Sequence, residues 1–433
     1  MPATVPATPV SRNITNGSRV TEESNQHLRG GEPAAPPGEW AAGWRTLTAA
    51  FFGVGVGWNF ANIAASMFLK PMQADFGWTR TELSFGPLAG LLVAFLLPIT
   101  GLLLDRLGSR RVAIIGFAGI AMGFALFARM PVNHAIFIIC TIYLGFAGAI
   151  SNSVVMGRGV APWFTQNLGT AIGVMMTGSS VSVAIAVPLL SRLIGQQGWR
   201  SGFLALMAAT LILGLPLVLV WFREPADAAT IGKPVSQPRD SMRTIAVTRR
   251  FWQLTVACGL AALPIGGFIG HLIPLLSDQG LSVAAAAGLG SLFALSIGVG
   301  RIANGYALDR LNPPFVIAFT LLLAGVGALI LYLSHLSFAG GAAVTIAIAL
   351  IGLAQGAEGD YIMFFSMRLF GLRNFSRVVS IQSMVIGVGM ALGGLIFAKV
   401  FDMFGSYRPA ILGSALLYAG GAIVFGSIRM KRE

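Results

Sequence analysis

Twelve long apolar stretches, separated by short polar segments, restrict this chain more than any other feature. A helix needs about 20 mostly apolar residues to cross the hydrocarbon core of a bilayer, and most of the stretches are near that length. They cover residues 46–68, 83–104, 112–127, 135–156, 168–194, 201–222, 251–276, 283–308, 315–336, 340–365, 378–401 and 409–428. A β-barrel would instead show short alternating segments. The sequence predicts an all-α polytopic membrane protein with twelve transmembrane helices.

The composition excludes other broad classes of protein. Of 433 residues, 55% are hydrophobic and 10% are charged, whereas about 25% of residues are charged in an average soluble protein. A soluble enzyme, a disordered chain and a fibrous repeat do not fit these values. The apolar stretches hold no nucleophile–base pair and no cluster of metal ligands, so we expect neither an enzyme nor a bound cofactor. Cys140 and Cys258 both lie in apolar stretches and are expected to be core residues.

A polar stretch divides the twelve predicted helices into six and six. Residues 1–44 are rich in Pro, Ser, Thr, Asn and Glu, which predicts a disordered cytoplasmic tail. The N-terminal six-helix half covers residues 45–222, and residues 223–250 form the central cytoplasmic loop. The C-terminal six-helix half covers residues 251–428, and residues 429–433 form a second cytoplasmic tail.

The basic residues predict the orientation of the chain. The net charge is +13, but the Lys and Arg residues are scattered between apolar stretches, so the charge does not indicate nucleic-acid binding. Placing the N-terminus inside leaves about three times as many basic residues on the cytoplasmic side as outside, in agreement with the positive-inside rule. We therefore expect a multi-pass protein of the bilayer, in a bacterial inner membrane, with both termini in the cytoplasm.

A short motif occurs in both halves. Gly101 lies at the end of the second stretch and Asp105, Arg106 and Leu107 follow it, and the same residue types recur 204 positions later, as in Asp309. Internal repeats of this kind are typical of secondary transporters, whose substrate site lies between the repeats near the bilayer midplane. The chain contains no Walker motif, so we expect a gradient or an exchange reaction, and not ATP, to drive transport.

Residues 101–111 resemble the loop signature of the major facilitator superfamily, and residues 305–310 repeat it. Residues 68–82, 271–282 and 356–360 are similar to the branch of monocarboxylate transporters and oxalate–formate exchangers. The resemblance spans about residues 45–428 and implies two six-helix halves with alternating access. It implies a gating role for the charged residues of the two loops, Asp105, Arg106, Arg110, Arg111, Asp309 and Arg310.

Two departures from that branch stand out. Residues 162–167 replace a basic cluster that usually follows the aromatic pair there. The first helix lacks a lysine at mid-depth, and Lys70 lies at its outer end instead. Recognition of substrate charge therefore cannot be assigned to a lysine of the first helix.

Arg301 is the candidate that would bind substrate. It precedes Asp309 by eight residues, which places it about 12 Å above the inner end of its helix and near the midplane. A guanidinium binds a carboxylate through two parallel hydrogen bonds and stays charged. The alternative is a structural ion pair with Glu358 or Asp360.

Three residues are candidates for proton coupling. Glu358 lies about 15 Å deep by its distance from Arg368, and Asp360 lies two residues later, so only one of the two can face a cavity squarely. We favour Glu358 as the proton carrier. His271 titrates in a suitable range, although hydrogen bonding to a backbone carbonyl is an equal alternative.

Uncharged polar residues within the stretches are further candidates for substrate contact. They are Asn59, Asn152, Gln355 and Gln382. Hydrogen bonding between helices is the more common use of such residues in membranes.

The sequence as a whole indicates a secondary active transporter that carries a small organic anion, expected to be a monocarboxylate, together with a proton. The alternatives are exchange of organic anions, efflux of an amphipathic compound, or, as a different class, a non-transporting sensor on a transporter scaffold. No nucleic-acid partner is expected.

Overall fold

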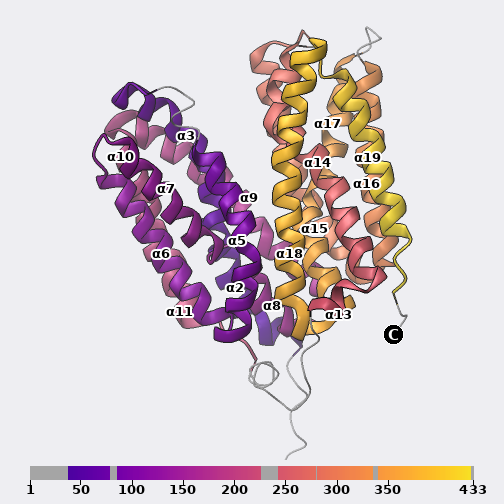
Figure 1. Ribbon diagram of the computed structural model, residues 1–433, viewed down its shortest axis with the longest axis horizontal. Coiled ribbons are helices and arrows are strands. Elements are labelled where there is room, and N and C mark those ends of the chain that lie inside the picture. Colours follow the sequence, from indigo (N-terminus) through magenta and orange to yellow (C-terminus); the bar gives the residue numbers. More distant parts are fainter. Residues whose placement is uncertain (1–37, 79–84, 226–241, 279, 335–339, 431–433) are drawn as a thin grey trace, which may run out of the picture. The chain divides into compact units, whose positions relative to one another are not determined.

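The computed structural model describes residues 38–78, 85–225, 242–278, 280–334 and 340–430 (Figure 1). All regular secondary structure in these ranges is helical. The N-terminal half contains α2 (Glu39–Val56), α3 (Trp58–Phe76), α5 (Phe85–Leu107), α6 (Ser109–Arg129), α7 (His134–Ala149), α8 (Ser153–Val160), α9 (Leu168–Gln197), α10 (Trp199–Ala209) and α11 (Leu215–Trp221). The C-terminal half contains α13 (Met242–Ala246), α14 (Arg249–Asp278), α15 (Val283–Arg310), α16 (Pro313–Ser334), α17 (Gly340–Gly356), α18 (Glu358–Phe404) and α19 (Arg408–Gly426).

The helices correspond to the predicted stretches, although several are interrupted. Gly57 separates α2 from α3, and a π-helical turn at Thr210–Gly214 joins α10 to α11. Conversely, α18 joins the end of the tenth stretch to the eleventh, with Gly371 at a φ of 70° between them. Within the described ranges, nine helical segments are long and apolar enough to cross a membrane, residues 341–404 counting as one. The fold is that of an all-α membrane protein, as predicted.

The first helix starts earlier than the sequence suggested. It begins at Glu39, inside the segment assigned to the polar tail. Trp40 packs edge-on against Phe164 at 5.1 Å between ring centroids, and Trp44 packs against Trp221 at 5.2 Å. These aromatic contacts stabilise the first turns of α2, which are too polar to be recognised as part of a membrane span by hydropathy.

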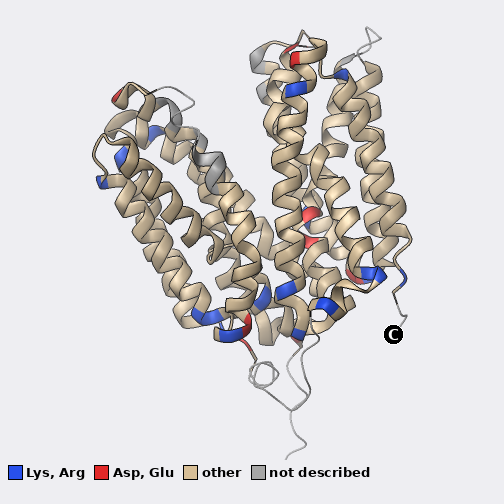
Figure 2. Cartoon of the chain, in the orientation of Figure 1, with Lys and Arg blue, Asp and Glu red and all other residues tan. Residues whose placement is uncertain are grey.

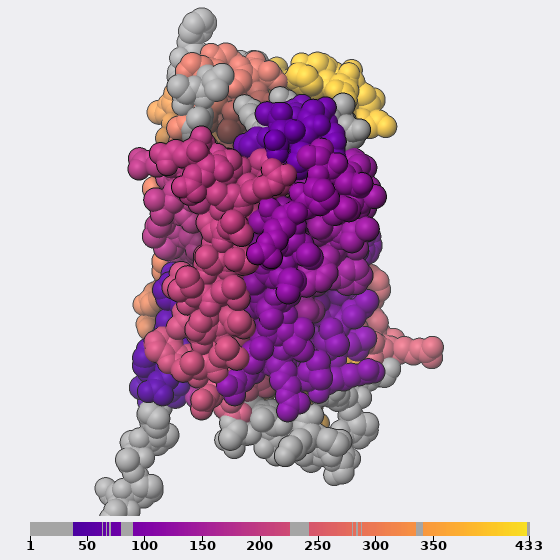
Figure 3. Space-filling view, turned by 90° about the vertical axis from the view of Figure 1, so that its left-hand side faces the viewer, coloured from indigo at the N-terminus to yellow at the C-terminus, as the bar shows by residue number. Residues whose placement is uncertain are grey.

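The outer faces of both halves are apolar, as contact with lipid requires. Ile139 and Ile212 of the N-terminal half and Leu416 of the C-terminal half are examples of exposed large apolar residues. Figure 3 shows one outer face of the molecule, formed mainly by helices of the N-terminal half. Charges instead gather mainly at the helix ends (Figure 2). We call the end that holds Asp105, Asp309, Arg377 and Arg429 the basic end.

Small residues let the two halves approach closely. α9 packs against α15, and α5 packs against α18. A Cβ atom added at Gly173 of α9 would lie 2.6 Å from the carbonyl oxygen of Arg301, and one added at Gly101 of α5 would lie 2.6 Å from the Ser380 hydroxyl. Such small-residue contacts are typical of helix packing in membranes.

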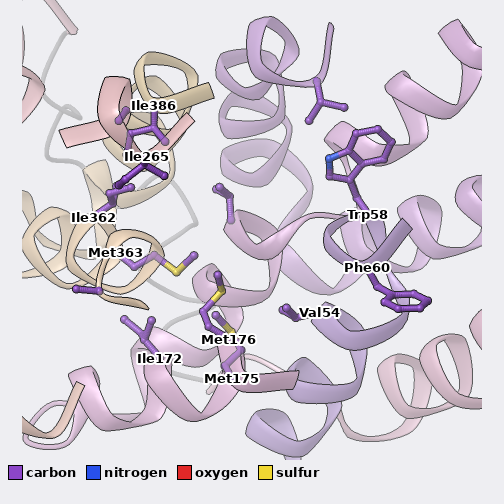
Figure 4. Packing of buried hydrophobic residues seen from close by; sticks show 14 of the residues in the cluster. Val54, Trp58, Phe60, Ile172, Met175, Met176, Ile265, Ile362, Met363 and Ile386 are labelled. Atoms are coloured by element: carbon purple, nitrogen blue, oxygen red, sulfur yellow. The ribbon is translucent and has the colours of Figure 1, made fainter. Parts of the chain in front are cut away.

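Methionines fill the contact between the halves. Met363 of α18 lies near Met175 and Met176 of α9 (Figure 4). A Cβ at Gly359 would meet the methyl group of Met176, which places that side chain against the start of α18. Methionine is flexible and adapts to altered packing, so this contact can re-form when neighbouring helices shift.

Candidate functional site

Arg301 projects from the middle of α15 toward α9 of the other half. Its Nη1 donates to the carbonyl oxygen of Met176 at 2.5 Å, to the Ser179 hydroxyl at 2.8 Å and to the Ser180 hydroxyl at 3.2 Å. All three acceptors are neutral. The guanidinium is within electrostatic range of Asp360 and Glu358, but neither is among these acceptors. A half-buried cation therefore lies at the contact between the two halves.

Asp360 and Glu358 begin α18 and face different surroundings. Asp360 is fully buried, and its Oδ2 lies 3.5 Å from where a Cβ of Gly173 on α9 would be, which directs it toward the other half. Glu358 is within electrostatic range of Cys258 and of the buried hydroxyls of Tyr361 and Tyr418, all in the C-terminal half. Among the described residues, no hydrogen-bond partner is found for either carboxylate oxygen of Asp360 or for the Oε1 of Glu358. Carboxylate oxygens buried in this way within a membrane span mark functional candidates.

The uncharged candidates divide into two groups. Asn152 caps α8, with its Oδ1 accepting from the Val154 N–H at 2.8 Å, and Asn59 accepts from the Ser153 N–H at 3.2 Å. Both stabilise the break in the fourth stretch. Gln382 donates to the Thr255 hydroxyl at 2.8 Å. The Oε1 atoms of Gln355 and Gln382 are buried without a hydrogen-bond partner among the described residues, so these two remain the better candidates for substrate contact.

His271 is held by groups of its own half. Its Nδ1 lies 3.2 Å from the Tyr407 hydroxyl, and its Nε2 lies 3.0 Å from the carbonyl oxygen of Gly394. The ring also stacks on Phe397 at 6.1 Å between centroids. The contact with Gly394 is the hydrogen bond to a backbone carbonyl that was the alternative to proton coupling for His271.

Asp309 reaches from α15 to the first turn of α9. Its Oδ1 accepts from the Gly169 N–H at 2.7 Å, and its Oδ2 accepts from the Thr170 N–H at 2.7 Å and from the Thr170 hydroxyl at 2.6 Å. Asn167, the N-cap residue of α9, makes no side-chain cap. A carboxylate of the C-terminal half thus caps a helix of the N-terminal half. We call this contact the Asp309 latch.

Asp105, the residue of the N-terminal half that is equivalent to Asp309, also contacts the opposite half. Its Oδ2 forms an ion pair with the Nε of Arg377 on α18 at 2.7 Å. This ion-pair partner lies 272 residues away along the chain, in the other half. We call this contact the Asp105 latch.

The other predicted gating arginines do not reach the opposite half through any described contact. Arg110 donates to the carbonyl oxygen of Leu219 in its own half at 2.6 Å. Arg310 lies over the Tyr306 ring of its own helix at 4.8 Å. Arg106 and Arg111 are exposed at the surface.

Glu39 was not among the residues predicted from the sequence, yet it makes several hydrogen bonds. Its carboxylate accepts five hydrogen bonds from the loop before α9, which come from the N–H groups of Thr165, Gln166 and Asn167 and from the side chains of Thr165 and Asn167. Burial raises the pKa of Glu39, but the hydrogen bonds from Thr165, Gln166 and Asn167 outweigh it and lower the pKa to about 2. In the sequence, only the atypical loop at residues 162–167 pointed to an unusual contact in this region.

Arg368 also links the halves and was not singled out. Its Nη2 donates to the carbonyl oxygen of Thr165 at 2.7 Å. The same short loop is therefore held by Glu39 from its own half and by Arg368 from the other. Within the described residues, no group of three His, Cys, Asp or Glu side chains could hold a metal ion.

Two six-helix halves, a half-buried cation at their contact and carboxylate latches at one end define a helical membrane transporter. A family model described as Major Facilitator Superfamily matches residues 47–394. The chain belongs to the major facilitator superfamily, and it is a transporter and not an enzyme.

Curated relatives and solved structures agree with this assignment. The chain is 25% identical over 413 residues to human monocarboxylate transporter 11, covering 91% of this chain and 84% of the relative. It is 29% identical over 307 residues to a gallate transporter of Pseudomonas putida, covering 61% and 66%. The crystal structure of the transporter FucP in the outward conformation matches with a TM-score of 0.71 and 19% identity, covering 89% of this chain and 98% of FucP.

Proposed function

We propose that the protein is a secondary active transporter that carries a small organic anion, a monocarboxylate, together with a proton by alternating access. The observation that carries the proposal is the placement of Arg301. This residue lies at the contact between the halves, where transporters of this architecture bind substrate. Its guanidinium donates to neutral acceptors, so an entering carboxylate can replace them with a stronger, charge-assisted pair.

The names of the relatives support a carboxylate as substrate. Monocarboxylate transporter 11 and the gallate transporter are both named for carboxylic acids or their salts. The guanidinium of Arg301 can form a bidentate pair with one carboxylate, which suits a monocarboxylate. The buried amide oxygens of Gln355 and Gln382 would accept hydrogen bonds from hydroxyl groups of a substrate.

Glu358 is the proposed proton carrier, and Asp360 is its alternative. Both are within electrostatic range of Arg301, so an anion that binds Arg301 changes the balance of charge around them. Protonation of a neighbouring carboxyl would then accompany binding of the anion, and release on the other side would return both. His271, held by Tyr407 and Gly394, is the weakest of the three candidates.

The two latches supply the proposed gate. Both lie at the basic end, which we propose to be cytoplasmic in a bacterial inner membrane. Their closure would leave the site open to the outside, and their opening would accompany release inside.

Uptake into proteoliposomes tests the substrate and the role of Arg301. We expect uptake of one or more labelled acids from a panel of acetate, lactate, benzoate, gallate and succinate, with stimulation by an inward proton gradient. Arg301→Lys should lose most transport because the bidentate geometry is lost, and Arg301→Ala should bind no acid. Arg249→Ala, at an exposed position, is the control. Near-normal affinity in Arg301→Ala would place the substrate site elsewhere.

Coupling is tested in the same vesicles with Glu358→Gln and Asp360→Asn. The variant that lacks the proton carrier should still exchange substrate at equal pH but should not accumulate it against a gradient. Gradient-driven uptake that survives in both variants would exclude both carboxylates from coupling.

Orientation is tested with single added cysteines, because Cys140 and Cys258 are buried. Val247, between α13 and α14, is 85% exposed, and Val132, between α6 and α7, is 56% exposed. We expect an impermeant maleimide added to intact cells to label Val132→Cys and not Val247→Cys. The reverse pattern would invert the proposed topology.

A further inference from the structure

A cavity of about 870 Å³ lies at the basic end of the C-terminal half, away from Arg301, Glu358 and Asp360. It is lined by residues from α14, α15, α16, α18 and α19 and from the segment after α19. Its volume is within the range of ligand sites in proteins. The residues that bind substrate in the proposal above do not line it, so it calls for a different occupant.

The charges that line this cavity favour an anion. Arg250, Arg368 and Arg429 line it, against the single carboxylate of Asp309. Asp309 already accepts three hydrogen bonds from α9, so it is directed away from an occupant. α16 begins at Pro313 on the wall of the cavity, and the positive end of its helix dipole adds to the field.

The residues beside the arginines favour an occupant with hydrocarbon chains. Leu311 and Phe315 line the cavity and are 65% and 64% exposed. From Phe315, exposed apolar residues continue along one face of α16 at helical spacing, namely Phe319, Leu322, Val326, Leu329 and Leu333. This stripe covers about 27 Å of helix, close to the thickness of the hydrocarbon core. A small soluble anion would make no use of it.

We propose that this cavity binds the headgroup of an anionic phospholipid, whose acyl chains lie along the exposed stripe of α16. Basic pockets between transmembrane helices are suited to phosphate headgroups, and arginine binds phosphate oxygens in a bidentate manner. The proposal goes beyond the transport function and does not depend on the identity of the substrate.

The site also adjoins the contact between the halves. Arg368 lines the cavity and donates to Thr165 of the other half, and Asp309 lines it and forms the Asp309 latch. If the halves separate at this end, Asp309 and Arg368 each lose a hydrogen-bond partner in the other half. Lipid bound in the cavity therefore affects the balance between the closed and open latch if it binds the two states unequally.

Binding is tested on the purified full-length protein in detergent by titration with dioctanoyl phosphatidylglycerol, dioctanoyl phosphatidylcholine and inorganic phosphate, each followed by native mass spectrometry. We expect saturable binding of phosphatidylglycerol alone. The double variant Arg250→Gln/Arg429→Gln should bind it roughly 30-fold more weakly, from about one charge–headgroup interaction per arginine.

Arg249→Gln is the matched control, because Arg249 is adjacent to Arg250 and is also exposed but does not line the cavity. It should bind phosphatidylglycerol as the wild type does. Equal weakening in the control, equal binding of phosphatidylcholine, or phosphate that competes at similar concentration would each overturn the proposal. These outcomes would mean general surface charge, an apolar site or a soluble-anion site, respectively. The arginines replaced are exposed, and each single variant serves if the double variant fails to fold.

Discussion

Asp105 and Asp309 occupy the same position in the two repeats, yet they bind different kinds of partner. Asp105 pairs with the guanidinium of Arg377, whereas Asp309 accepts from two backbone N–H groups and a hydroxyl at the start of α9. One latch depends on a charged side chain and the other on the end of a helix. Duplication therefore preserved the carboxylate, while the opposing half determined the chemistry of each contact.

This difference has a consequence for how each latch fails. An ion pair needs charge on both partners. A helix N-terminus needs an acceptor in the right place, and its dipole adds a smaller preference for negative charge. Truncation should therefore damage the Asp309 latch more, and neutralisation should damage the Asp105 latch more.

Asp309→Ala should have the largest effect, because it removes three hydrogen bonds at once. Hydrogen bonds to charged groups contribute about 1.5–3 kcal/mol each, although they are not additive. We expect about 3 kcal/mol less stability for the latched state, roughly a hundredfold change in the equilibrium. Distances between spin labels at Val132 and Met403, both exposed, report the population. A shift smaller than that of Asp105→Ala would contradict the comparison.

When the carboxylates are neutralised and not truncated, the Asp105 latch should lose more stability than the Asp309 latch. Asp105→Asn should destabilise the latched state by about 1.5–3 kcal/mol, because the charge that binds Arg377 is lost. Asp309→Asn retains an oxygen that can accept from the Gly169 N–H, and we expect a loss of about 1 kcal/mol. The same spin-label distances measure both. If the two variants shift the population equally, the chemical distinction between the latches is wrong.

Glu39 is another carboxylate that accepts backbone hydrogen bonds, and its contribution to stability should depend on pH. Its pKa of about 2 lies below the ordinary value of 4.5, so its charged form stabilises the folded protein above pH 4.5. That contribution should be lost as pH falls from 4.5 toward 2. The melting temperature of the wild type should therefore exceed that of Glu39→Gln at pH 6 and approach it in acid. A difference that is the same at pH 6 and pH 3 would mean that the carboxylate charge has no role.

Arg106→Gln and Arg111→Gln should have the smallest effects. Both residues are exposed, and surface substitutions usually change stability by less than about 0.5 kcal/mol. We expect the spin-label distances to match those of the wild type. A clear shift in either variant would show that the loop arginines act on the gate directly, as the family resemblance implied.

The halves, the helices and the charge of Arg301 within an apolar stretch could be predicted from the sequence because each depends on local information. A stretch of about 20 apolar residues crosses a bilayer whatever its neighbours are. The repeated motif placed Asp105 and Asp309 at equivalent ends, and Arg301 was identified because a charge within an apolar stretch is costly unless it is used.

The tertiary structure decided which residue meets which. Arg377 lies 272 residues from Asp105 and was one basic residue among many. Glu39 lay in a stretch assigned to the tail until five hydrogen bonds from residues 165–167 defined its role. The direction of Asp360 toward Gly173 of α9 likewise came only from the structure. Hydropathy is a property of each helix alone, whereas hydrogen bonds act over about 3 Å and depend on the packing and rotation of helices against one another.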